Sequence, residues 1–95
     1  MYVFMIEDII YNWSIEKNKI LIKDRWVSFE EVVYAVKDDK ILDVIKNPSS
    51  NYDNQYCYII EINNYVYLVP FVVNKNEYFL KTIYPSRKYT KIYLK

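Results

Sequence analysis

The sequence predicts one α+β domain over residues 1–95, in which two N-terminal helices and a short C-terminal helix pack against an antiparallel sheet of about four strands. Three observations lead to this prediction. The chain has 95 residues, the size of one small domain. Apolar residues make up 53% of it, which suffices for a hydrophobic core. Two helix signals come early in the chain, followed by a run of strand signals and a final helix signal.

The N-terminal part predicts a loose extension, a strand and a helix. Residues 1–8 begin apolar and end in two acids, and we expect them to be loose or weakly paired. Residues 9–11 are typical of a first strand. Ser14 precedes a stretch suited to a helix over 15–25, and a serine there can accept a hydrogen bond from the first turn.

The second helix has the clearest signal in the sequence. Ser28 and Glu31 have the spacing of a capping box, in which each side chain bonds the backbone of the other residue. Apolar residues then recur at the spacing of one helical face: Phe29, Val32, Val33 and Val36. The pattern predicts an amphipathic helix over 28–38.

Four apolar stretches predict the strands of the sheet, at 41–45, 56–62, 65–73 and 78–84. Asn63-Asn64 separates two of them and suits a two-residue hairpin, because Asn tolerates left-handed backbone angles. The chain has no glycine, so we expect asparagines at the turns that need a positive φ. Pro70 interrupts its strand and predicts a bulge or an edge there.

Turn residues divide the rest of the C-terminal half. Residues 47–51 predict a loop. Pro85 ends the last strand, and Ser86 can cap a short final helix that runs to about Leu94.

Composition excludes several classes of site. The chain has no His, which rules out a Ser-His-Asp triad and a histidine metal site. The single cysteine, Cys57, excludes a cysteine zinc site and is read as a small strand hydrophobe. Without glycine there is no Walker loop or dinucleotide fingerprint. We therefore expect no cofactor and no metal, and no apolar run approaches the roughly 18 residues of a membrane span.

Charge is concentrated at the C-terminus. Lys and Arg total 13 against 12 Asp and Glu, but residues 81–95 hold five basic residues and no acid. Tyrosines alternate with these cations. Because cations bind phosphates and aromatic rings stack on unpaired bases, the segment predicts an RNA-binding surface. The alternative is a solvated helix whose lysines favour its negative end.

Three segments together carry a family resemblance. They are Trp13-Ser14-x-x-Lys17-Asn18, Val27-Ser28-Phe29-Glu30-Glu31-Val32, and Lys81-Thr82-Ile83-Tyr84-Pro85-Ser86-Arg87-Lys88-Tyr89-Thr90. In this order and spacing the chain resembles the BrnT family of bacterial type II toxins, over roughly residues 9–94. The resemblance implies a RelE-like fold and a cytoplasmic, metal-independent endoribonuclease (an mRNA interferase). It also implies an RNA substrate, met on the ribosome, and a DNA-binding antitoxin of the ribbon-helix-helix type as partner.

The sequence departs from the family pattern at three places. Ser14 stands where the family has Asp, and both residues cap helices. Asp24-Arg25-Trp26 stands where the family has Lys-His-Gly, so a proton transfer by that His is lost here. The family's basic residue on the last strand falls opposite Thr82 rather than Lys81, and neighbouring strand residues face opposite sides.

The resemblance and the chemistry of RNA cleavage select the candidate site residues. RNA supplies its own 2′-OH nucleophile, so the protein must hold the phosphate, stabilise its charge and move protons. Arg87 is our candidate for the phosphate, with Lys88 and Arg25 assisting. The candidates for proton transfer are Lys23, Lys81, Glu30 and Tyr93. The hypothesis requires the C-terminal cations to converge in a pocket shaped for a phosphate.

Other residues have simpler interpretations. Trp13 and Trp26 are read as core or rim packing, and the alternating tyrosines of 56–67 as residues of a sheet face. Two alternatives to the nuclease remain open. The protein can be a module that binds RNA or protein without cleaving, or an interaction protein whose tyrosine-rich sheet is the interface.

Overall fold

The computed structural model describes residues 2–47 and 53–94, and most of these belong to one sheet and three helices. The strands are β1 (Tyr2–Ile6), β2 (Ile9–Trp13), β3 (Ile41–Lys46), β4 (Gln55–Ile62), β5 (Tyr65–Asn74), β6 (Glu77–Leu80) and β7 (Tyr84–Pro85). The helices are α1 (Ile15–Arg25), α2 (Phe29–Lys37) and α3 (Arg87–Tyr93). The predicted loop at 47–51 lies almost entirely outside the described residues.

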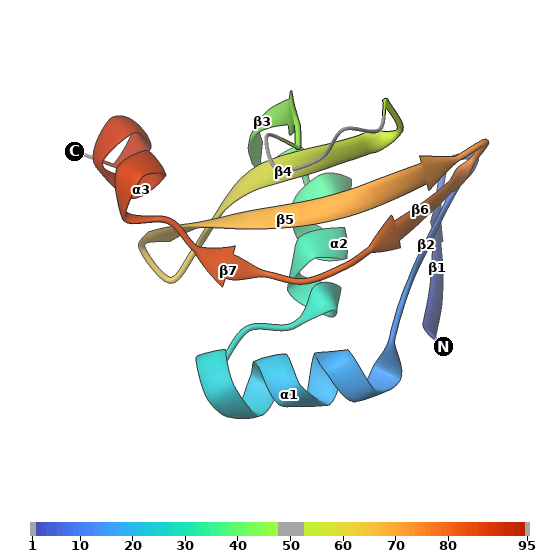
Figure 1. Ribbon diagram of the computed structural model, residues 1–95, viewed down its shortest axis with the longest axis horizontal. Coiled ribbons are helices and arrows are strands. Elements are labelled where there is room, and N and C mark those ends of the chain that lie inside the picture. The colour runs from blue at the N-terminus through green and yellow to red at the C-terminus, as the bar shows by residue number, and fades with distance from the viewer. Residues whose placement is uncertain (1, 48–52, 95) are drawn as a thin grey trace.

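The predicted sheet of about four antiparallel strands is wrong. The sheet has seven strands in the order β1-β2-β6-β5-β4-β3, with β7 paired to β5 (Figure 1). It is mixed, because β2 and β6 run parallel while the other pairs are antiparallel. Two strands come from the N-terminal segment, and the stretch expected at 78–84 divides into β6 and β7. The RelE-like antiparallel sheet expected from the resemblance is therefore corrected to this larger mixed sheet.

The N-terminal segment forms a hairpin rather than a loose extension. β1 pairs with β2 in continuous register from Ile6↔Ile9 to Tyr2↔Trp13. Glu7 makes the turn with a φ of 55°, a left-handed value that sequence gives no reason to expect of Glu. Phe4 stacks on Trp13 with ring centroids 5.8 Å apart. The acids that suggested the end of an extension are instead the turn of a hairpin.

The predicted helices and their N-caps are confirmed. Ser28 and Glu31 form both halves of the capping box, with the Ser28 N–H donating to Glu31 Oε1 at 2.8 Å. The oxygens of the other two predicted caps each accept a backbone N–H from the first turn: Ser14 from Lys17 at 3.2 Å and Ser86 from Tyr89 at 3.1 Å. Local capping chemistry thus fixes where all three helices begin.

The turn at Asn63-Asn64 is also confirmed, with φ values of 53° and 65°. It joins β4 to β5 in unbroken register from Ile62↔Tyr65 onward. Other left-handed positions fall on residues that the sequence did not single out: Glu7, Trp26, Asp39 and Lys75. Asparagine therefore occupies only some of the positive-φ positions of the described chain that glycine would suit.

Pro70 causes no bulge. It has no backbone N–H, and its position in β5 does not require an N–H to donate to a neighbouring strand. It pairs with Cys57 within the continuous β4–β5 register. On the other side of β5, β7 pairs with residues 67 and 68 and β6 with residues 71–74, so Pro70 falls between the two. Its carbonyl still accepts the Lys81 N–H at 2.9 Å. A proline is tolerated here for the same reason that edge strands tolerate it.

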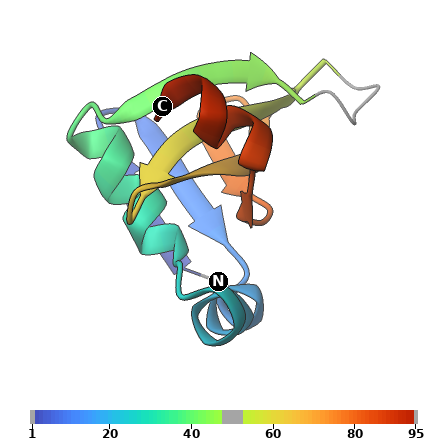
Figure 2. The same cartoon turned by 90° about the vertical axis from the view of Figure 1, so that its left-hand side faces the viewer.

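Helices cover both faces of the sheet (Figures 1 and 2). α1 and α2 pack on one face around the fully buried Trp13 and Phe29. α3 packs on the other face, where Tyr89 and Leu94 lie against Cys57 and its neighbours. Trp13, predicted as core or rim packing, lies in the core, and Cys57, predicted as a small strand hydrophobe, is buried in β4. Among the described residues, no helix is both long and apolar enough to cross a membrane.

Candidate functional site

Arg25 is held in place at the C-terminal end of α1. Its guanidinium donates to the carbonyl of Ile83, 2.5 Å away, and this bond ties α1 to the segment between β6 and β7. The side chain is otherwise exposed, and no carboxylate of the described residues pairs with it. Because a guanidinium carries five N–H donors, most of them remain for a ligand.

Arg87 and Lys88 follow the same segment. The Ser86 N–H donates to the Val66 carbonyl at 2.9 Å, and the Val66 N–H donates to Thr90 Oγ1 at 2.9 Å. These two bonds fix the start of α3 on β5. Arg87 is then the first residue of α3, and its side chain is exposed. Arg87 lies four positions after Ile83 in the chain, so their Cα atoms are at most about 14 Å apart.

Four predicted cations thus lie at the C-terminal end of α1 or in the chain from the end of β6 to the start of α3. The C-terminal end of α1, β7 and the start of α3 lie along one side of the molecule in Figures 1 and 2. All four side chains are exposed, and Lys88 Nζ lies 5.4 Å from the centre of the Tyr89 ring. We call this surface the cationic edge: Arg25, Lys81, Arg87 and Lys88.

The other three predicted site residues are not part of this surface. Lys23 lies two residues from Arg25 on α1, which places it on the opposite face of the helix. Tyr93 donates a hydrogen bond to Asp43 Oδ2 at 3.3 Å, on β3. Partial desolvation and the Asp43 charge raise the pKa of Tyr93, so its hydroxyl stays protonated at neutral pH.

Glu30 has a structural role in the contact between α1 and α2. Its Oε1 accepts from Asn18 Nδ2 at 2.8 Å, while Asn18 Oδ1 accepts the Phe29 N–H at 2.8 Å. Asn18 is buried. Its Oδ1 satisfies the Phe29 N–H, a donor in the first turn of α2 that has no partner within the helix. The Asn of the Lys17-Asn18 motif and the Glu of the Phe29-Glu30 motif are explained by this one contact.

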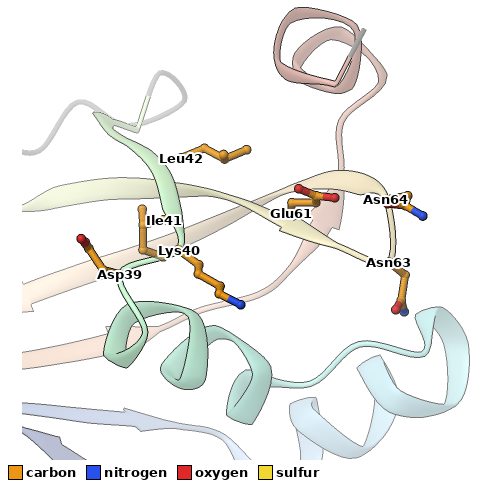
Figure 3. Close-up of a pocket in the computed structure, with 7 residues that line it drawn as sticks. All are labelled: Asp39, Lys40, Ile41, Leu42, Glu61, Asn63 and Asn64. Atoms are coloured by element: carbon orange, nitrogen blue, oxygen red, sulfur yellow. The ribbon is translucent and has the colours of Figure 1, made fainter.

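The cationic edge lies outside the five cavities that the structure describes. A groove of about 610 Å³ lies between the end of α2, the start of β3 and the β4–β5 hairpin. Figure 3 shows its lining: Asp39, Lys40, Ile41, Leu42, Glu61, Asn63 and Asn64. The other prominent cavities of the described chain are also lined by residues outside the cationic edge. None of these five cavities is therefore the phosphate-shaped pocket that the hypothesis expects.

A second group of candidate side chains consists of tyrosines on the strands of the sheet, away from the cationic edge. The hydroxyls of Tyr11 and Tyr58 lie 2.8 Å apart and are buried, and Tyr58 stacks on Phe71 at 4.3 Å. Burial raises the pKa of both hydroxyls. They line an apolar cavity of about 420 Å³. Of the tyrosines expected on a sheet face, Tyr58 lies in the core, and Tyr56 and Tyr67 are partly buried against it.

Trp26 is the residue whose placement sequence reasoning missed. It was expected in the core or its rim, but 82% of it is exposed. It ends α1 in a left-handed conformation (φ 59°, ψ 33°), with its N–H donating to the Ile22 carbonyl at 3.1 Å. The glycine that the BrnT pattern has at this place was the available signal, because glycine commonly takes this conformation after a helix.

Comparison with known proteins finds no family model and no curated protein that matches this chain. Within the described residues, no group of three carboxylate or thiol side chains is placed to hold a metal ion. The resemblance to the BrnT toxins therefore stays a prediction.

Proposed function

We propose that this protein binds RNA through the cationic edge and acts as the toxin of a bacterial type II toxin–antitoxin pair, a metal-independent endoribonuclease of the cytoplasm. The observation that supports RNA as the ligand is the placement of Arg25. Two distant segments, α1 and the C-terminal stretch, meet at its bond to the Ile83 carbonyl. The toxin role and the ribbon-helix-helix antitoxin rest on the resemblance.

The exposed arginines suit the chemistry of phosphate binding. A guanidinium offers paired N–H groups that match two phosphate oxygens and stays charged at any physiological pH. Arg87 and Arg25 can each hold a phosphate without first breaking an ion pair with a described residue. In cleavage they would stabilise the charge that develops on the phosphate as the 2′-OH attacks.

A second candidate function is RNA binding without cleavage. It is favoured by the positions of the proton-transfer candidates. Glu30 is bonded to Asn18, Tyr93 to Asp43, and Lys23 lies on the far face of α1. Of the four, only Lys81 belongs to the cationic edge.

One experiment separates the two functions. Purified protein is incubated in EDTA with end-labelled mRNA, with and without ribosomes, and both bound RNA and new RNA ends are measured. Cleavage predicts new ends that are lost in Arg87→Ala and kept in Lys37→Ala, which removes an exposed lysine of α2. Binding without new ends favours the second candidate, and absence of binding refutes both.

A growth test addresses the toxin role directly. Expression of the wild-type chain should arrest bacterial growth, and Arg87→Ala should relieve the arrest at equal protein level. Normal growth with the wild-type chain would refute the toxin role, whereas an Arg87→Ala variant as toxic as wild type would refute the assignment of Arg87.

A further inference from the structure

Trp26 combines three properties that a residue of the core or of an ordinary surface does not combine. It is the largest kind of side chain, it is 82% exposed, and its backbone is left-handed. The other positive-φ residues of the described chain are all polar: Glu7, Asp39, Asn63, Asn64 and Lys75. A left-handed backbone is unfavourable for a bulky residue, and an exposed ring gains little from the hydrophobic effect. Packing therefore gives no reason for a tryptophan here.

Trp26 directly follows a positioned cation in the chain. Arg25 precedes it and donates to the Ile83 carbonyl, so a guanidinium held by a hydrogen bond lies one residue before the exposed ring. Asp24, two residues before Trp26, is also exposed. An exposed ring that follows a positioned cation in the chain offers partners for the two parts of a nucleotide, the flat base and the phosphate.

We propose that Trp26 is a stacking platform for an unpaired base, so that the ligand of the cationic edge is single-stranded RNA. This inference rests on the proposed function, because it assigns the ligand class of the same surface. Bases within a duplex have their faces covered by neighbouring pairs, whereas bases in a single strand can stack on an aromatic side chain. Arg25 holds the adjoining phosphate and Trp26 holds the base.

The test measures binding of three fluorescently labelled probes by anisotropy at low salt. The probes are a short single-stranded RNA, the same RNA in a duplex, and a single strand of equal length that lacks bases. The variants are Trp26→Ala, Trp26→Gly and Trp26→Phe. The matched control is Tyr34→Ala, which removes an exposed ring from α2. Because Trp13 is fully buried, quenching of tryptophan fluorescence by RNA reports on Trp26.

We expect Trp26→Ala to bind single-stranded RNA at least about fivefold more weakly, the lower end of the contribution of one stacked base. Trp26→Phe should bind nearly as the wild type, and Tyr34→Ala should not differ from it. The probe without bases should bind wild type and Trp26→Ala equally, because both keep the same cations. Trp26→Gly, which relieves the backbone, should bind as weakly as Trp26→Ala, so a folding defect cannot explain the loss.

Two contrary results have different meanings. If the wild type binds RNA and Trp26→Ala binds it equally well, the stacking inference is wrong while the RNA-binding function stands. If the wild type binds none of the probes, the proposed function fails and the inference fails with it.

Discussion

Replacement of Trp26 by glycine should stabilise the protein, although it removes the most exposed aromatic ring of the described residues. A left-handed backbone costs a non-glycine residue about 1–2 kcal/mol. Glycine gives up about 0.5–1 kcal/mol of this gain through its greater freedom in the unfolded chain. Since 82% of Trp26 is exposed, little buried area is lost. The free energy of unfolding should therefore rise by about 0.5–1 kcal/mol.

Urea denaturation followed by circular dichroism measures this change. The midpoint should move to higher urea with an unchanged m-value, and the melting temperature should rise by about 3–6 °C for a domain of this size. Trp26→Ala keeps the backbone strain and should be less stable than Trp26→Gly by about 1 kcal/mol.

Asn63→Gly is the matched control. Asn63 has a similar φ of 53°, but asparagine tolerates this conformation, so the gain should be smaller than at Trp26. A Trp26→Gly variant less stable than the wild type would show that the ring stabilises the fold. That result would remove the strain argument on which the functional interpretation of Trp26 depends.

Two further predictions concern buried polar groups. Asn18→Ala should lower the free energy of unfolding by about 1–3 kcal/mol, because it leaves the Phe29 N–H and the Glu30 carboxylate without their partner. Urea denaturation measures this change, and a change below the error of the measurement would contradict the role given to Asn18. The raised pKa values of Tyr11 and Tyr58 mean that the unfolded chain loses protons first as pH rises, so stability should fall above about pH 10. Tyr58→Phe should weaken this fall, and an identical pH profile for both proteins would refute the assignment.

The sequence predicted those parts of the fold that depend on neighbouring residues. Ser28 and Glu31 define a helix start within one turn, and Asn63-Asn64 defines a hairpin within four residues. The parallel pairing of β2 with β6 depends on residues such as Ile10 and Glu77, far apart in the chain, and no local pattern specifies it. The β1–β2 turn was missed because Glu7 takes a conformation usual for glycine or asparagine.

The candidate site was predictable to a similar degree. The C-terminal charge, the resemblance and the chemistry of RNA cleavage selected cations that are exposed, and the chain brings Arg25 to the C-terminal segment. Sequence spacing could not show that Arg25 rather than Lys23 meets that segment, or that Glu30 is bonded to Asn18, because both facts depend on how α1 docks. The exposure of Trp26 likewise follows from the direction of the chain after α1, which tertiary contacts determine.

The parallel pairing of β2 with β6 also affects the order in which the protein can assemble. Ile10 donates its N–H to the Asn76 carbonyl at 2.8 Å, and Asn76 Nδ2 donates to the Asp8 carbonyl at 3.0 Å. During synthesis the N-terminal hairpin therefore emerges long before its neighbour in the sheet exists. Contacts between residues far apart in the sequence slow folding. The pairing of β2 with β6 should therefore form late and limit the rate at which the native sheet forms.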